Sequence, residues 1–211
     1  MANLVSSPNR LEALSDGVIA VIITIMVLEL HVPRQNGLAG LRVILPTLGV
    51  YALSFCFVSV YWVNHHHLVH RAEQVDQAIL YSNLFFLFSL SLTPFFTAYV
   101  IDKAYDSFSV LLYILTMIAT GLSFLLLRLA IGRRLRRQQQ LQVEDRAAEI
   151  KHWASLGLYL LAIPLDIHYP LAALGILVLV MVIWIYPTAP PTLVNCPSSV
   201  VPQSEETSPL A

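Results

Sequence analysis

Long apolar segments separated by short polar ones constrain the fold of this chain more than any other feature. The stretch from Gly17 to Leu28 contains no charged residue, and further apolar blocks follow at 41–67, 78–100, 108–131 and 153–186. A helix of about 20 apolar residues crosses a bilayer. The chain is 57% hydrophobic and only 12% charged, with a mean hydropathy of +0.70, values that soluble domains do not reach. We therefore expect an all-α integral membrane protein.

The last apolar block is too long for one span, and Pro164 and Pro170 divide it into two helices. The sequence thus predicts six transmembrane helices per subunit, at about 12–31, 41–67, 78–100, 108–131, 153–165 and 169–186. Pro94 predicts a kink late in the third helix. Residues 10–186 are expected to form one membrane domain, after a short lead, 1–9, and before a Pro- and Ser-rich tail, 187–211, that we expect to be disordered and cytoplasmic.

Basic residues are unevenly distributed among the expected loops. The outer segments hold only Arg34, Arg42 and Lys103, whereas the inner ones hold Arg10, Arg71, Arg133, Arg134, Arg136, Arg137, Arg146 and Lys151. Because cytoplasmic loops are enriched in basic residues, we expect a multi-pass protein of the cell membrane with both termini in the cytoplasm. A net charge of -1 does not indicate a nucleic-acid partner. Walker loops, dinucleotide fingerprints and Ser/His/Asp arrangements are absent, so we expect neither an enzyme nor a cofactor.

The first expected helix carries a regular stripe. At about 100° per residue, one face holds Gly17, Val21, Thr24 and Leu28, with Leu14 and Ile25 at its margins. Asp16 falls roughly on the opposite side, so a helix that turned the stripe towards an axis would turn Asp16 towards neighbouring helices. The stripe is typical either of a pore lining or of an ordinary packing face.

Polar residues gather at the expected cytoplasmic ends of the first three helices. Arg10 and Asp16 flank the first, and the other two contribute His65, His66, His67, His70, Asp76 and Asn83. Such groups are costly near a bilayer, so we expect them to form a polar network that holds the first helix against the other two. This network has either a purely structural role or a role in gating. In it, Asp16 would accept from Asn or His, and Arg10 would donate to oxygen atoms. His66 and His70 are also spaced to hold a metal, which leaves a histidine-cluster membrane enzyme or metal transporter as an alternative.

The segment RLEALSD, from Arg10 to Asp16, resembles the signature Arg-x-x-x-Phe-Ser-Asp of the transmembrane protein 175 family of lysosomal and bacterial potassium channels. Agreement extends over residues 10–186 and includes Trp62, His65, His66, Asn83 and the pair Pro94-Phe95. The resemblance implies a homotetramer in which the first helix of each subunit lines a central pore without a TVGYG filter. It also implies potassium ions, other copies of the chain and membrane lipids as partners.

The resemblance further implies roles for single residues. Pore-lining positions correspond to Val21, Thr24, Ile25 and Leu28, and the structural and gating network corresponds to Arg10, Leu14, Ser15, Asp16, Trp62, His65, His66 and Asn83. The chain departs from the family pattern at Leu14, which replaces the usual Phe, and at Val21, where a bulkier Ile or Leu is common. The narrowest ring could therefore move to Ile25 or Leu28.

Our hypothesis is a homotetrameric, potassium-preferring cation channel in which apolar rings of the first helix close the pore by constriction and dewetting. Two alternatives stay open. The histidine cluster fits a metal-dependent enzyme or metal carrier, and a membrane scaffold without transport would bury the stripe of the first helix away from water.

Overall fold

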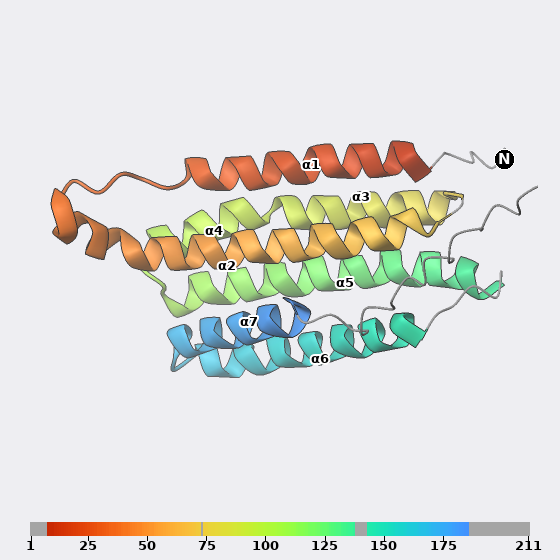
Figure 1. The fold of residues 1–211 in the computed structure, drawn as a ribbon. Coiled ribbons are helices and arrows are strands. Elements are labelled where there is room, and N and C mark those ends of the chain that lie inside the picture. Colours follow the sequence, from red (N-terminus) through yellow and green to blue (C-terminus); the bar gives the residue numbers. More distant parts are fainter. Residues whose placement is uncertain (1–7, 73, 138–142, 186–211) are drawn as a thin grey trace, which may run out of the picture.

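The computed structural model describes residues 8–72, 74–137 and 143–185, and these residues fold into helices that run along one another as a bundle (Figure 1). The chain order is α1 Pro8–Leu28, α2 Gly37–His70, α3 Gln77–Ser91, α4 Thr93–Asp102, α5 Ser107–Arg137, α6 Val143–Asp166 and α7 Pro170–Ile185. The protein is therefore all-α where the structure describes it, as the sequence predicts.

Several helices are long and apolar enough to cross a bilayer. Within the described residues these are α1, α2, the α3–α4 pair taken as one span over Gln77–Asp102, and α5. Helix α7 is apolar but shorter, and α6 opens with a charged segment that contains Glu149 and Lys151. Among the described residues, the fold is thus that of a multi-pass membrane protein with four candidate spans. Helices α6 and α7 correspond in sequence to the last two predicted helices, and their crossing of the membrane stays a prediction.

The helix bounds differ from those expected in places that local chemistry explains. The third predicted helix is divided at Leu92 into α3 and α4, and Pro94 lies in the first turn of α4, where its missing N–H is tolerated. Helix α6 begins at Val143 instead of Trp153, because residues 143–152 are charged but contain no helix breaker. Helix α1 begins at Pro8, inside the expected lead, and the expected tail lies outside the described residues.

Helix α5 lies at the centre of the bundle. It packs against α3, α4 and α6, and its side chains Tyr113, Phe124 and Leu127 are fully buried. Figure 1 shows α1 along one edge and the α6–α7 pair along the opposite edge. Among the described helices, α1 packs mainly against α2, α3 and α4, and the face of α1 turned away from them is exposed in the described structure.

Candidate functional site

Helix α1 has one buried and one uncovered face. The buried face consists of Leu11, Ser15, Ile19, Ile22 and Met26, which follow the three-and-four spacing of a helical stripe. These side chains pack on α2, α3 and α4. The opposite face carries the stripe of Gly17, Val21, Thr24 and Leu28, so within a single chain this stripe is not a packing face.

The uncovered face of α1 is apolar. Val21 is 54% exposed and Leu28 is 78% exposed, and Leu14, Gly17, Thr24 and Ile25 are also exposed. The Thr24 hydroxyl donates to the Val21 carbonyl over 2.9 Å. This bond uses its only proton, which leaves lone pairs of Oγ1 as acceptors on the exposed face. Residues of this face, including Val21 and Ile25, form one wall of an open groove of about 650 Å³ between α1 and the α3–α4 junction, and Pro94 and Phe95 lie on its far wall.

A buried chain of hydrogen bonds joins α1, α3 and α2. Asn83 Nδ2 donates to Ser15 Oγ over 3.0 Å, and Ser15 Oγ donates to the Leu11 carbonyl over 2.8 Å. His65 Nε2 lies 2.7 Å from Asn83 Oδ1. Because an amide oxygen only accepts, His65 must carry its proton on Nε2. Ser15, Asn83 and His65 are all fully buried, so these hydrogen bonds fix the position of α1 against α2 and α3.

A second, more exposed pair of contacts connects α1 with α2. Trp62 Nε1 donates to Asp16 Oδ1 over 2.8 Å, so Asp16 accepts from an indole and not from the expected Asn or His. One turn away on both helices, His66 Nδ1 lies 2.7 Å from Glu12 Oε1. Sequence reasoning missed Glu12, although its spacing of four residues from Asp16 places both carboxylates on one helix face.

The structure leaves some predicted residues outside this network. Arg10 is exposed and makes no hydrogen bond or ion pair with any residue that the structure describes, and Leu14 lies on the uncovered face.

The rings of His66 and His70 stack at 5.9 Å. Among the described residues, however, no group of three or more His, Cys, Asp or Glu side chains is placed to hold a metal. The histidine-cluster alternative therefore gains no support from the geometry.

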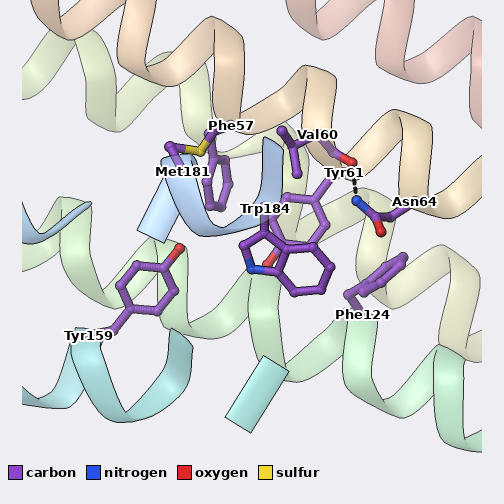
Figure 2. A pocket seen from close by; sticks show the side chains of 8 residues that line it. All are labelled: Phe57, Val60, Tyr61, Asn64, Phe124, Tyr159, Met181 and Trp184. Atoms are coloured by element: carbon purple, nitrogen blue, oxygen red, sulfur yellow. Dashed lines mark hydrogen bonds between the residues drawn. The ribbon is translucent and has the colours of Figure 1, made fainter. Parts of the chain in front are cut away.

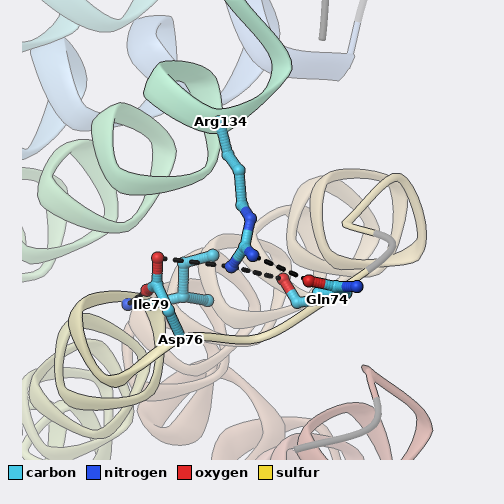
Figure 3. Close-up of polar contacts among 4 residues, drawn as sticks. All are labelled: Gln74, Asp76, Ile79 and Arg134. Atoms are coloured by element: carbon cyan, nitrogen blue, oxygen red, sulfur yellow. Dashed lines mark hydrogen bonds and ion pairs between the residues drawn. The ribbon is translucent and has the colours of Figure 1, made fainter. Parts of the chain in front are cut away.

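Sequence reasoning also missed a set of polar contacts at the same end of the bundle, between α5 and the loop that joins α2 to α3 (Figure 3). Arg134 of α5 donates from Nη2 to Gln74 Oε1 over 2.9 Å and from Nη1 to Asp76 Oδ2 over 3.3 Å. The other carboxylate oxygen of Asp76 accepts from the Ile79 amide over 2.9 Å and so caps α3. One guanidinium thus ties the end of α5 to the loop between α2 and α3.

A small internal cavity lies far from the uncovered face, between α2, α5, α6 and α7 (Figure 2). Its walls are mostly aromatic and include Tyr61, Phe124, Tyr159 and Trp184. Its volume of about 10 Å³ leaves room for roughly one water molecule. The polar group of Asn64 is turned to the Val60 carbonyl, 2.8 Å away. This cavity is a packing void and not a route for ions.

Comparison with known proteins gives consistent results. The family model described as endosomal/lysosomal potassium channel TMEM175 matches residues 10–94. A protein named as a potassium channel from Chryseobacterium sp. is 39% identical over 178 residues, which cover 84% of this chain and 92% of that protein. Another protein named as a potassium channel, from Chamaesiphon minutus, is 33% identical over 172 residues, covering 76% of this chain and 85% of that one.

A solved structure extends the likeness to three dimensions. The crystal structure of a lysosomal potassium-selective channel TMEM175 homolog from Chamaesiphon minutus superposes with a TM-score of 0.73 at 25% identity, covering 84% of this chain and 96% of that chain. These bacterial relatives are named as channels and not as enzymes. With a relative so similar over nearly its whole length, this chain belongs to the TMEM175 family of potassium channels.

Proposed function

We propose that this protein is a potassium-preferring cation channel in which α1 of each of four identical subunits lines a central pore. The observation that carries the proposal is the two-faced character of α1. One face is buried and hydrogen-bonded to α2 and α3, and the other, with Val21, Thr24 and Leu28, is uncovered in a single chain. Membership of a potassium-channel family supports this reading of the face.

The groove beside α1 supports an assembly of several copies. It is mostly apolar, and Phe95 on its far wall is itself well exposed. Apolar surface of this extent marks a contact with protein or lipid. A contact between two different surfaces of identical chains closes into a ring when the rotation allows it. Val21 and Ile25 form the near wall of this groove, so a neighbouring subunit that contacts Phe95 on the far wall would leave the stripe of α1 facing the ring axis.

The proposed gate consists of apolar rings. Four copies of Val21, Ile25 and Leu28 would form successive constrictions, and a narrow apolar constriction excludes water and the ions that need it. The Thr24 oxygens, with lone pairs free on the exposed face, would replace part of the hydration shell of a passing cation. No TVGYG filter occurs in the sequence, so selectivity would arise within this helix.

The polar network would set the pore radius. Its bonds hold α1 against α2 and α3 through Ser15, Asp16 and Glu12. All of these side chains leave the helix on the side away from the stripe, so a change in their bonds would tilt or rotate α1 relative to the axis. In the proposed topology, six helices cross the membrane, and this end of the bundle and both termini lie in the cytoplasm, which the distribution of basic residues supports.

Ion flux into liposomes tests the proposal. Purified protein should admit potassium faster than sodium, and Leu28→Ala and Val21→Ala should raise the flux because each widens a ring. Val178→Ala on α7, which is exposed to a similar degree as Val21 but lies in a helix far from the proposed axis, serves as the control and should leave the flux unchanged. Flux from an assembled tetramer that responds equally to all three substitutions would rule out α1 as the pore lining.

A further inference from the structure

A basic hollow lies at the end of the bundle where α2, α5 and α6 meet, away from the uncovered face of α1. Its volume is about 150 Å³. Its charged lining consists of Arg128, Arg133, Arg136 and Glu149, and Leu68 and Leu129 belong to its apolar lining. Among the lining residues that the structure describes, basic side chains therefore outnumber acidic ones. Neither the proposed pore nor the polar network around Ser15 uses these residues.

The guanidinium groups differ in how they are held. Arg128 is partly buried, and its guanidinium lies 5.6 Å from the centre of the Phe124 ring, which orients it. Arg133 and Arg136 are exposed, and no residue that the structure describes forms an ion pair or hydrogen bond with either. The hollow is therefore lined by the oriented guanidinium of Arg128 and by the exposed guanidinium groups of Arg133 and Arg136, which can each donate two parallel hydrogen bonds.

The position of the hollow matches the level of lipid headgroups. Helix α5 is apolar from Phe108 to Leu127 apart from scattered hydroxyls, and its basic residues begin at Arg128 and continue from Arg133. This end of the bundle is also where most of the basic residues of the chain gather, which places it at the cytoplasmic leaflet. That leaflet carries anionic lipids, and basic pockets between helices there bind phosphate headgroups.

We propose that this hollow binds the headgroup phosphate of an anionic membrane lipid. Arg133 and Arg136 donate charge-assisted hydrogen bonds to the phosphate oxygens, and the leucine side chains contact the upper acyl chain. The apolar lining favours a lipid over free phosphate, because a free anion would gain nothing from the leucines. Such a lipid touches α2, α5 and α6 at once and so stabilises the side of the bundle remote from the pore helix.

Lipid titration of the purified full-length protein, followed by native mass spectrometry, tests the proposal. Phosphatidylglycerol should bind more tightly than phosphatidylcholine, and the double substitution Arg133→Gln/Arg136→Gln should weaken phosphatidylglycerol binding about tenfold or more. Glu149→Gln should strengthen it, because this removes a carboxylate that repels the phosphate. Both arginines are exposed, so the double variant should retain the wild-type unfolding temperature in phosphatidylcholine.

The matched control is Arg34→Gln/Arg42→Gln, which removes the same charge from exposed positions at the other end of the bundle. This control should bind phosphatidylglycerol as the wild type does. Equal losses in the two double variants would show a general effect of charge and overturn the site. Displacement of phosphatidylglycerol by inorganic phosphate at an equal concentration would assign the hollow to soluble phosphate and overturn the lipid.

Discussion

Asn83 of α3 donates a hydrogen bond from Nδ2 to Ser15 Oγ of α1 over 3.0 Å, in a site where both residues are fully buried. These residues lie far apart in sequence, and the same amide accepts from His65 of α2 through its oxygen. One side-chain amide thus holds three helices together. Because the uncovered stripe of α1 lies opposite Ser15, this bond links the interior of the subunit to the proposed pore.

Ser15→Ala should lower the unfolding free energy by about 1–2 kcal/mol, because it leaves a buried Asn83 donor without an acceptor. The matched control is Ser59→Ala. Ser59 also donates to a carbonyl one turn back, that of Phe55 at 2.8 Å, but no partner from another helix is recorded for it among the described residues. Unfolding in mixed micelles should show a clear loss for the first variant and a change within about 0.5 kcal/mol for the second.

Asp16→Ala should reduce potassium flux, whereas Asp16→Asn should retain most of it. The Trp62 indole donates to one carboxylate oxygen of Asp16, and an asparagine oxygen in the same place accepts the same bond. A comparison of the potassium flux of the two variants distinguishes a requirement for the hydrogen bond from a requirement for the negative charge. If both substitutions abolished flux equally while tetramers still formed, the negative charge, and not the indole bond, would be the requirement.

Thr24→Cys, in a Cys56→Ser/Cys196→Ser background, should react with a water-soluble thiol reagent. Thr24 lies on the uncovered stripe, and water in an open pore would carry the reagent to it. The matched control is Val178→Cys on α7, a position that is about half exposed in a single chain and faces lipid in the proposed assembly. Reaction at position 24 with protection at 178 supports a pore. Protection at both positions would favour a scaffold that buries the stripe.

Val21→Ile should slow conduction if Val21 forms the narrowest ring, because four added methyl groups narrow the constriction. Val27→Ile adds the same methyl group to a residue of similar exposure that lies off the stripe, and it should leave conduction unchanged. Single-channel recording measures both. An unchanged conductance in Val21→Ile would move the narrowest point to Ile25 or Leu28.

The Arg134–Asp76 ion pair should contribute only modestly to the free energy of unfolding, because the Arg134 side chain is 30% exposed and that of Asp76 is 47% exposed. A double-mutant cycle of Arg134→Gln and Asp76→Asn should give a coupling free energy of about 0.5–1 kcal/mol. Asparagine retains the cap of α3, so the cycle isolates the ion pair. High salt should reduce the coupling. A coupling near zero at low salt would show that Gln74 alone holds the guanidinium.

Much of the architecture could be predicted from local patterns in the sequence. The apolar blocks correspond to helices, Pro94 marks the break between α3 and α4, and the uncovered face of α1 coincides with the stripe that its helical spacing predicts. The bounds were less accurate, because α6 begins well before Trp153. A charged segment without glycine or proline extends a helix as readily as it ends one.

The partners of individual side chains could not be predicted in this way. Trp62 lies 46 positions from Asp16, and Arg134 lies 60 positions from Gln74. Which side chains meet depends on the rotation and axial offset of two packed helices, and a shift of one residue turns a helix face by about 100°.

The sequence alone therefore determined the membrane class, the helices and the two-faced first helix, since bilayer thickness and helical period act locally. Only the tertiary structure decided that Glu12 meets His66, that Arg10 stays outside the network and that the basic hollow forms, because these depend on how separate helices pack.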